Sequence, residues 1–293
     1  MLEKVIGNWT SRLDYIRASR GSPMPEIIFK MPNKIKTTDI ELSITVTDDK
    51  PIYHSPRRLP FTERDIVDKQ IDEWTQNGVI EPCSSACASQ VLVVRKKDGS
   101  PRVCIDFRKL NCVLVKDPYP LPLIEDILDK LQDTRVFSTI DLRNGFFHVP
   151  VNKQSRPYTS FVTQNGQFQF LKMHFGLSTC PSTFQRFINT VFRDLVVQGI
   201  VLPYMDDIVI LAKNESEAID RLKKVLQVST DYGLEINFDK CQFLHRKIEF
   251  LGHIIENNKL FPSPSKTKSV VNYPEPKTTK EVQRFFRSHW IFS

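Results

Sequence analysis

The sequence predicts an α+β fold, in which short antiparallel strands and amphipathic helices alternate along a chain of 293 residues. Two hairpin patterns support this prediction. Residues 91–94 (VLVV) and 103–105 are apolar and enclose a basic loop, and residues 201–211 (VLPYMDDIVIL) are apolar on both sides of two acids. Apolar residues also recur at helical spacing after Pro181 and after Asn214, which indicates two longer helices.

The composition is that of an ordinary globular protein. Hydrophobic residues make up 40% of the chain and charged residues 26%, so a chain of this length can bury a substantial core without disulfides. The formal net charge of +7 fits an anionic partner such as nucleic acid, although a merely soluble basic protein is the alternative. Since no run approaches 18 apolar residues, we expect a soluble intracellular protein without a membrane span.

Six cysteines are present, and their spacing does not match a zinc finger or a Cys-x-x-Cys pair. Cys83 and Cys87 form the only close pair, for which a metal role is the alternative reading. We expect free thiols in a reducing compartment.

Residues 1–50 are expected to form an N-terminal extension or linker, with one strand at Glu41–Val46 (ELSITV). Thr62 is the expected N-cap of the first helix, which ends near Gly78. The apolar residues of this helix recur at helical spacing: Val67, Ile71 and Trp74.

Later elements follow from the same patterns. Residues 136–141 (VFSTID) are expected to form a buried strand, and Asn214 with Glu217 to cap a helix that ends near Gly233. A last helix is expected to start at Thr278 or Thr279. Two further helices open at prolines. One follows Pro120 and Pro122, with an apolar face of Ile124, Ile127, Leu128 and Leu131, and the other follows Pro181, with Phe184, Phe187, Ile188, Val191, Phe192 and Leu195.

Asp206 and Asp207 are adjacent acids within an apolar segment. A buried carboxylate is costly unless it is paired or bound to a metal, and two neighbouring carboxylates repel each other. Because no cation adjoins them in the sequence, a divalent ion explains the pair, and oxygen ligands favour Mg²⁺ or Mn²⁺. The alternative is an exposed hairpin tip, where Asp is a common turn residue.

Asp141 ends the apolar strand of residues 136–141, and it is either a turn residue or a partner of the acid pair. Acids at the ends of two strands can meet at one edge of a sheet. Three carboxylates there would hold two metals ~3.5–4 Å apart, which is the arrangement used for in-line phosphoryl transfer. One metal would activate a primer 3′-hydroxyl, and the other would neutralise the triphosphate and the leaving pyrophosphate.

A set of motifs in fixed order gives the sequence its family resemblance. Tyr204-Met205-Asp206-Asp207 matches the Y-x-D-D box of reverse transcriptases, and the other blocks take the expected positions around it. The blocks are KKDGSPRVCIDFRKLN (96–111), YPLP (119–122), FSTIDLRNGFFHVPV (137–151), TSFVTQNGQFQFLKMHFGLSTCPSTFQRFIN (159–189) and KCQFLHRKIEFLGHII (240–255). The chain resembles the reverse transcriptases of Ty3/gypsy-type long-terminal-repeat retrotransposons over residues 51–285.

This resemblance implies a right-hand polymerase fold with fingers, palm and thumb, in which a small antiparallel palm sheet is backed by helices. It implies that Asp141 and Asp206 are the main metal ligands, that Asp207 is the third carboxylate, and that the Leu142 carbonyl is a further ligand. We expect residues 51–255 to form fingers and palm. Residues 256–293 would begin a thumb or connection region that is truncated before any RNase H domain.

The resemblance also assigns a pocket for the incoming nucleotide. Lys96 and Arg102 would clamp its phosphates, although a solvated cationic turn is the alternative. A shift of one residue in the match would exchange Lys96 for Lys97. Phe146 would block a ribose 2′-hydroxyl, unless it is simply one of the core phenylalanines.

Two other regions are assigned in the same way. Phe175 would line the nucleotide pocket, and the helix from Pro181 would pack under the template. The residues that resemble a primer grip are Phe250, Leu251 and Gly252, where a glycine lets two backbones approach closely.

The sequence departs from the family pattern at three places before its end. His174 stands where proline is usual, Pro101 stands where an aromatic residue is usual, and the stretch Ser178–Cys180 is atypical. After Phe285 the chain also leaves the family pattern, so we expect a truncated or frame-disrupted copy of a retroelement.

The expected activity is RNA- and DNA-templated DNA synthesis, with Mg²⁺ or Mn²⁺ as cofactor. The expected substrates and partners are deoxynucleoside triphosphates and a primed RNA or DNA template, in a cytoplasmic retroelement particle or the nucleus. The sequence does not fix the oligomeric state. A catalytically inactive remnant that only binds nucleic acid is the alternative. An RNA-dependent RNA polymerase is a third reading, against which Phe146 and the Met205 that precedes the acids argue.

Overall fold

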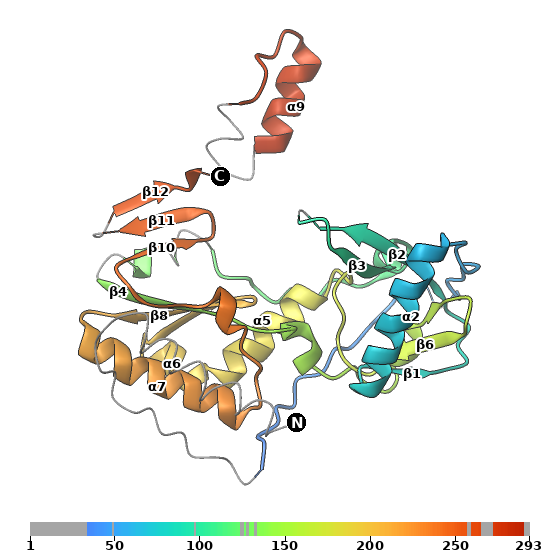
Figure 1. Cartoon of the computed structure of the whole chain (residues 1–293), viewed down its shortest axis with the longest axis horizontal. Coiled ribbons are helices and arrows are strands. Elements are labelled where there is room, and N and C mark those ends of the chain that lie inside the picture. Colours follow the sequence, from blue (N-terminus) through green and yellow to red (C-terminus); the bar gives the residue numbers. More distant parts are fainter. Residues whose placement is uncertain are drawn as a thin grey trace.

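The computed structural model describes residues 34–289 except for positions 49, 97, 124–125, 127–128, 132–133, 257–258 and 265–271, and it describes no side chains for residues 285–289. Figure 1 shows two sheets side by side. One is backed by helices α5, α6 and α7, and the other lies beside helix α2. A third, small sheet lies beyond the first sheet on the side away from α7, and α9 lies apart from all three in this view.

The first sheet matches the expected palm and is called the palm sheet below. Its strands are antiparallel, in the order β7 (Val201–Tyr204), β8 (Asp207–Ala212), β4 (Val136–Asp141) and β9 (Gln242–His245). Residues 208–212 of β8 are all buried. Such an unbroken apolar run indicates a strand that is covered on both faces, by helices on one side and by the third sheet on the other.

The helices behind the palm sheet begin largely where the sequence predicts. They are α5 (Cys180–Val191), α6 (Arg193–Val197) and α7 (Glu215–Asp231). In α7 the Glu217 amide donates to Asn214 Oδ1 at 2.9 Å, and Glu217 Oε2 accepts from the Lys213 amide at 2.7 Å, which confirms the cap. The single long helix expected after Pro181 is wrong, because Phe192 leaves helical geometry (φ −99°, ψ 16°) and separates α5 from α6.

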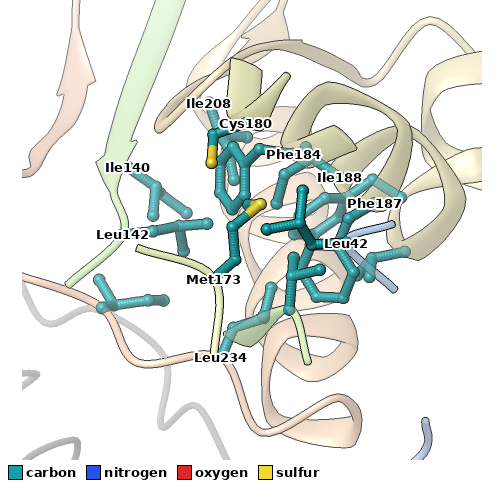
Figure 2. Packing of buried hydrophobic residues seen from close by; sticks show 14 of the residues in the cluster. Leu42, Ile140, Leu142, Met173, Cys180, Phe184, Phe187, Ile188, Ile208 and Leu234 are labelled. Atoms are coloured by element: carbon teal, nitrogen blue, oxygen red, sulfur yellow. The ribbon is translucent and has the colours of Figure 1, made fainter. Parts of the chain in front are cut away.

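The main core lies between the palm sheet and α5. Figure 2 shows Phe184, Phe187 and Ile188 of α5 facing Ile140 and Ile208 of the sheet. The segment before residue 50 also contributes, since Leu42 (0% exposed) packs among the α5 side chains. The strand expected at Glu41–Val46 forms only isolated bridges, Leu42 with Val151 and Val46 with Leu114.

The second sheet has five strands and is called the fingers sheet. Its order is β1 (Ile80–Pro82), β6 (Gln167–Phe170), β5 (Phe161–Val162), β2 (Ser89–Arg95) and β3 (Pro101–Asp106), in which only the β2–β5 pair is parallel. The β2–β3 pair confirms the predicted hairpin with a basic loop. The short helix α3 (Arg108–Val113) follows it.

Helix α2 (Phe61–Gln76) buries the predicted residues Val67, Ile71 and Trp74. The predicted N-cap Thr62 is wrong. Pro60 caps the helix instead, because its extended backbone (ψ 154°) lets its carbonyl accept from the amides of Glu63 and Arg64.

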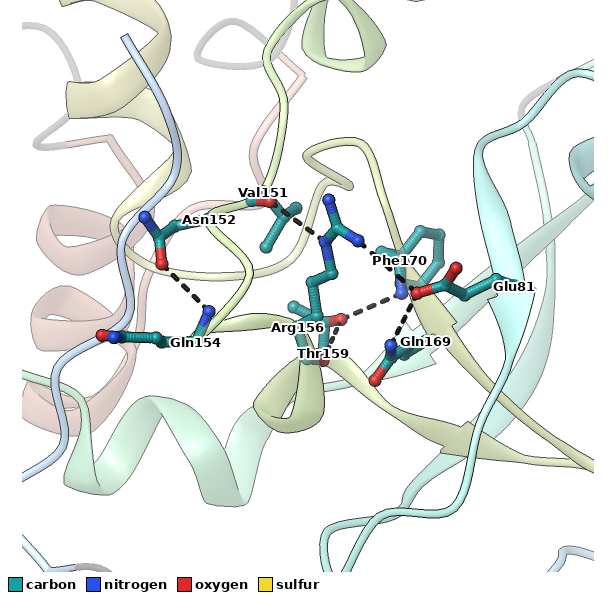
Figure 3. Close-up of polar contacts among 8 residues, drawn as sticks. All are labelled: Glu81, Val151, Asn152, Gln154, Arg156, Thr159, Gln169 and Phe170. Atoms are coloured by element: carbon teal, nitrogen blue, oxygen red, sulfur yellow. Dashed lines mark hydrogen bonds and ion pairs between the residues drawn. The ribbon is translucent and has the colours of Figure 1, made fainter. Parts of the chain in front are cut away.

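A polar cluster joins residues 151–159, which follow palm strand β4 and the turn η1 (Gly145–His148), to the fingers sheet. In Figure 3, Arg156 of the 3₁₀ helix η2 (Arg156–Thr159) donates from Nε to the Val151 carbonyl at 3.3 Å, and its Nη1 lies 3.6 Å from Glu81 Oε1 on β1. Thr159 Oγ1 accepts from the Phe170 amide at 3.0 Å. These bonds tie the segment that leaves the palm to β1 and β6.

The third sheet is an antiparallel meander of β10 (Lys247–Phe250), β11 (His253–Glu256) and β12 (Lys259–Pro262). The last helix, α9 (Thr279–His289), begins at a predicted residue, with Thr278 Oγ1 accepting from the Glu281 amide at 3.3 Å. Two further 3₁₀ turns are η1 (Gly145–His148) and η3 (Phe238–Lys240).

The helix predicted after Pro122 falls partly on residues that the structure does not describe, among them Ile124, Ile127 and Leu128. The part of the chain that the structure does describe has no helix that is both long enough and apolar enough to span a bilayer.

Candidate active site

The three acids lie at the same end of two paired palm strands. Asp141 is the register partner of Asp207 across β4 and β8, and Asp207 also pairs with Tyr204 across the β7–β8 hairpin. Met205 and Asp206 form the two-residue turn of that hairpin. Residues directly opposite in an antiparallel pair share one face of the sheet, so the backbone brings Asp141 and Asp207 together although 66 positions separate them.

The turn is strained at its first residue. Met205 has φ +54°, which is the left-handed region that two-residue hairpin turns require and that side chains other than glycine seldom adopt. This conformation costs about 1–2 kcal/mol. The next residue, Asp206, lies at the end of β4, where the Leu142 amide donates to the Asp206 carbonyl at 3.4 Å.

Asp206 carries an unfavourable charge. Its Oδ1 atom is buried and has no hydrogen-bond partner in the described part of the protein. Burial, followed by repulsion from Asp141 and Asp207, raises the pKa of Asp206 to about 6. Burial and the charge of Asp141 also raise the pKa of Asp207. The site therefore concentrates negative charge that a cation would offset.

Gly145 gives the Asp206 carboxylate its space. A Cβ atom on Gly145 would lie 2.5 Å from Asp206 Oδ1 and 2.9 Å from Phe184 Cζ. Both contacts are shorter than van der Waals distance, so no larger residue fits at this position without displacing the acid or the Phe184 ring.

Asp141 is held by the segment that leads into β9. The Asn237 amide donates to the Asp141 carbonyl at 2.9 Å, and Cys241 Sγ lies 3.5 Å from the Asp141 amide. Lys240 Nζ lies 3.4 Å from Asp141 Oδ2. A lysine so close to the three acids offsets part of their charge, and it lowers the pKa of Asp206 against the larger effects that raise it.

The donor set fits a hard divalent ion, because it consists of carboxylate oxygens that include an unpartnered one. As the side chains stand, no three His, Cys, Asp or Glu residues within the described ranges are arranged closely enough to hold a metal. Asp141 instead extends one oxygen toward Lys240. Metal ligation by the three acids and by the Leu142 carbonyl therefore stays a prediction.

Two of the residues that the sequence assigns to a nucleotide pocket are in contact. The guanidinium carbon of Arg102, on the fingers hairpin, lies 3.8 Å from the centre of the Phe175 ring. This distance is that of a stacked cation–π contact. Lys96 is exposed at the hairpin tip, where its amide donates to the Ser100 carbonyl at 2.9 Å, and Lys97 lies outside the described residues. Arg102 of the fingers hairpin and Phe175 of the loop before α5, both predicted from the sequence, are thus in contact.

His174 packs against the Phe175 ring. Its ring centre is 3.9 Å from that of Phe175, its side chain is buried, and Nδ1 lies 2.7 Å from the Phe175 carbonyl oxygen. Burial lowers the pKa of His174 to about 3, so the ring is neutral and Nδ1 carries the donated proton. The departure from the family pattern at this position is therefore an aromatic support for Phe175.

Phe146 follows Gly145 on η1 and is half-buried. Its ring packs against Phe184 of α5, with 4.9 Å between the ring centres. Phe146 is therefore anchored on one side by the core and lies one residue from the glycine that contacts Asp206. Both the core role and the predicted contact with the sugar are compatible with this position.

Of the predicted primer-grip residues, Phe250 ends strand β10, and Leu251 and Gly252 form the turn between β10 and β11. Leu251 and Gly252 both have positive φ angles, +48° and +74°, and the Gly252 carbonyl accepts from the Ser263 amide at 2.9 Å. Phe250 and Leu251 pack into an apolar cluster that also contains Tyr204 of the Y-x-D-D box. The turn is thus fixed to the outer face of the palm sheet, beside the hairpin that carries the acids.

Gln185, Gly145 and Lys240 were not predicted from the sequence. Gln185 was detectable as a polar residue on the apolar face of a predicted helix, between Phe184 and Phe187. It is fully buried and accepts a hydrogen bond from the Met205 amide. Lys240 opens one of the quoted motifs, but its spacing alone does not indicate the contact with Asp141.

Comparison with known proteins identifies the family. The family described as "Reverse transcriptase (RNA-dependent DNA polymerase)" matches residues 94–255, more than half of the chain. A retrovirus-related Pol polyprotein from transposon 297 of Drosophila melanogaster is 35% identical over 254 residues, which cover 85% of this chain and 24% of the relative. The chain thus spans about a quarter of that curated relative.

Solved structures show the same fold. A foamy viral protease-reverse transcriptase in complex with double-stranded DNA superposes with a TM-score of 0.75 at 24% identity, and covers 87% of this chain and 44% of its own. The foamy viral enzyme in complex with an RNA/DNA hybrid gives a TM-score of 0.71 at 22% identity, over 94% of this chain and 37% of its own. The predicted right-hand polymerase fold is confirmed.

Proposed function

Since this chain belongs to the reverse transcriptase family and is related to the Pol polyproteins of Ty3/gypsy-type retrotransposons, we propose that it extends a primer with deoxynucleotides on RNA and DNA templates. The observation that carries this proposal is the register of Asp141 against Asp207, with Asp206 in the adjoining turn. This arrangement collects three carboxylates at one end of the palm sheet, where phosphoryl transfer needs them.

The acids would hold divalent cations. Asp141 and Asp206 are the proposed main ligands, and Asp207 and the Leu142 carbonyl complete the set. Bound Mg²⁺ or Mn²⁺ lowers the pKa of a primer hydroxyl and neutralises charge on the triphosphate. The chain's own contribution is to fix the carboxylates on paired strands and to keep Gly145 free of a side chain beside Asp206.

The incoming nucleotide would bind between the fingers hairpin and the loop before α5. Arg102 is a suitable phosphate ligand, because its planar guanidinium is already stacked on Phe175 and loses little freedom on binding. Lys96 adds a second positive charge at the same hairpin. Phe146 would contact the sugar, where its bulk would exclude a ribose 2′-hydroxyl.

The primed template is the proposed partner. The foamy viral relatives are bound to double-stranded DNA and to an RNA/DNA hybrid, and the excess positive charge of this chain suits such ligands. Phe250, Leu251 and Gly252 would hold the primer end. We assign fingers and palm to residues 51–255 and the start of a thumb to residues 256–293, in a cytoplasmic retroelement particle or the nucleus.

The test is primer extension on poly(rA)/oligo(dT) and on a DNA template, with Mg²⁺ or Mn²⁺. We expect incorporation of deoxynucleotides in preference to ribonucleotides. Salt-dependent binding of the primed template without extension would instead support the second candidate, a remnant that only binds nucleic acid. The atypical sequence after Phe285 favours that candidate.

A further inference from the structure

Gln185 makes all of its side-chain hydrogen bonds in the interior of the protein. Its side chain is 0% exposed, and its Oε1 accepts from the Met205 amide at 2.8 Å. Its Nε2 lies 3.1 Å from the Pro203 carbonyl oxygen and 3.1 Å from Asn189 Oδ1. One buried amide therefore contacts the backbone on both sides of Tyr204, which is the first residue of the Y-x-D-D box.

The hairpin needs such a contact because its strand β7 is the edge of the palm sheet. Pro203 has no amide hydrogen, and alternate carbonyls of an edge strand face away from the sheet, where they have no partner within it. Met205 must also stay in the left-handed region, at φ +54°. Gln185 satisfies the outward carbonyl of Pro203 and the amide of Met205 together, so it holds the strained turn from the α5 side.

The bonds continue from Gln185 to a distant loop. Asn189, one helical turn along α5, accepts from Gln185 and donates from Nδ2 to the Tyr119 hydroxyl oxygen at 2.8 Å. The Tyr119 ring lies under the guanidinium of Arg186, 4.8 Å from its carbon atom. Arg186 Nη2 in turn donates to both carboxylate oxygens of Asp117, at 2.8 and 2.9 Å.

We propose that Tyr119, Asn189 and Gln185 form a positioning relay that sets the turn carrying Asp206 from the loop at residues 117–119. The proposal rests on the proposed function, because it assigns the relay to nucleotide addition at these acids. Within the described part of the chain, the side-chain hydrogen bonds of these residues run to Met205, Pro203 and one another, and not to the acids. The relay acts by orienting the Gln185 amide, which fixes the Met205 amide and hence the direction of the Asp206 side chain.

The first test replaces Gln185 with methionine, which keeps the volume and removes all three hydrogen bonds. We expect kcat for nucleotide addition to fall about 10- to 100-fold, which is the usual cost of removing a group that orients a metal ligand. The KM for the deoxynucleotide should change less than twofold, because the phosphate-binding residues are not touched. A kcat unchanged within a factor of two would overturn the proposal.

Ile188→Ala is the matched control. Ile188 is also 0% exposed on α5, and its apolar side chain makes none of the relay's hydrogen bonds, so its truncation destabilises the fold and leaves those bonds in place. We expect this variant to lower the melting temperature while kcat at 20 °C stays within twofold of wild type. An equal loss of kcat in Ile188→Ala and Gln185→Met would show that α5 packing, and not the relay, is responsible.

The second test uses Tyr119→Phe, which removes the hydroxyl and leaves the ring under Arg186. We expect kcat to fall about threefold in wild type and not to fall further when Gln185→Met is already present, since the relay is then broken. Losses that multiply in the double variant would contradict coupling between these two residues.

A third readout does not depend on catalysis, so it separates failure of the relay from failure of the proposed function. Hydrogen exchange of the Met205 amide, followed by NMR, should accelerate at least tenfold in Gln185→Met and measurably in Tyr119→Phe. Protection of that amide that is equal in the two variants and wild type would overturn the relay, whether or not the protein extends primers.

Discussion

Gly145 faces Asp206 so closely that a single added carbon atom would lie 2.5 Å from Oδ1 of the carboxylate. Gly145→Ala should therefore displace Asp206 and lower primer extension by more than tenfold. Overpacking at this point should also cost about 1–3 kcal/mol of unfolding free energy. Extension assays and denaturant titrations measure the two effects separately.

The variant Phe184→Leu distinguishes the two contacts of the added carbon. It relieves the 2.9 Å contact with the Phe184 ring but not the contact with Asp206. The double variant should extend primers no faster than Gly145→Ala alone. Restored extension would show that ring packing, and not the position of the acid, made the glycine necessary.

Asp206→Asn should stabilise the fold in the absence of divalent ions. Burial and repulsion raise the pKa of Asp206 from 3.8 to about 6, so its ionised form opposes folding above pH 6, and this cost disappears as the pH falls toward 3.8. Because the side chain is only partly buried and solvent screens its charge, we expect a gain of about 1 kcal/mol at pH 7.5. Urea denaturation at pH 7.5 and pH 5 measures this gain, which should shrink at the lower pH.

Asp72→Asn, on the exposed face of α2, is the control and should change stability at neither pH. Added Mg²⁺ should raise the urea midpoint of wild type and leave that of Asp206→Asn unchanged. Equal responses of the two proteins to Mg²⁺ would contradict metal binding at Asp206.

Arg102→Lys keeps the positive charge and loses the planar group that stacks on Phe175 at 3.8 Å. We expect the KM for deoxynucleotides to rise about three- to tenfold with little change in kcat, because a contact worth about 1 kcal/mol is lost from binding. Steady-state kinetics with the exposed Lys109→Ala as control checks this. A KM that does not change would remove Arg102 from the nucleotide site.

Phe146→Val should admit ribonucleotides, because the smaller side chain would leave room for a 2′-hydroxyl. The ratio of deoxynucleotide to ribonucleotide incorporation should fall at least tenfold, while extension with deoxynucleotides persists. Phe184→Leu removes the ring on which Phe146 packs but keeps the Phe146 side chain itself, so it should lower the ratio less. Discrimination that stays the same in Phe146→Val would place the sugar gate elsewhere.

His174 should make stability fall on acidification. Burial lowers the pKa of His174 from 6.5 to about 3, so the unfolded chain binds the proton first, and stability that is complete above pH 6.5 is lost as the pH falls toward 3. Between pH 6 and 4, the unfolding free energy of His174→Phe should decline less steeply than that of wild type. The difference between the two slopes should be about 1.4 kcal/mol per pH unit. Identical slopes in the two proteins would contradict a buried neutral histidine.

The sequence predicted the elements whose patterns are local. The strand at residues 136–141, the acid-bearing hairpin and the Asn214 cap are confirmed, because alternation, apolar runs and capping residues depend on neighbouring positions. The break at Phe192 was not predictable, since the apolar spacing continues through it.

In the candidate site, too, contacts between distant segments could not be predicted from local sequence patterns. That Asp141 would meet the Asp206–Asp207 pair at one edge of a sheet was predicted from family resemblance and from the strand ends, but its register with Asp207 was not. The need for a glycine at position 145 depends on a contact between segments about 60 positions apart. Gln185 could be suspected as a polar residue on an apolar helix face. Its partners at Met205 and Pro203 follow only from the packing of α5 against the edge strand β7.

The most direct measurement is single-nucleotide addition to a primed RNA template with Mg²⁺, comparing wild type with Asp206→Asn and with the surface variant Asp72→Asn. Wild type and Asp72→Asn should extend the primer at equal rates. Asp206→Asn should show no extension while it remains folded and binds the primed template. Extension by Asp206→Asn at the wild-type rate would contradict a catalytic centre at these acids.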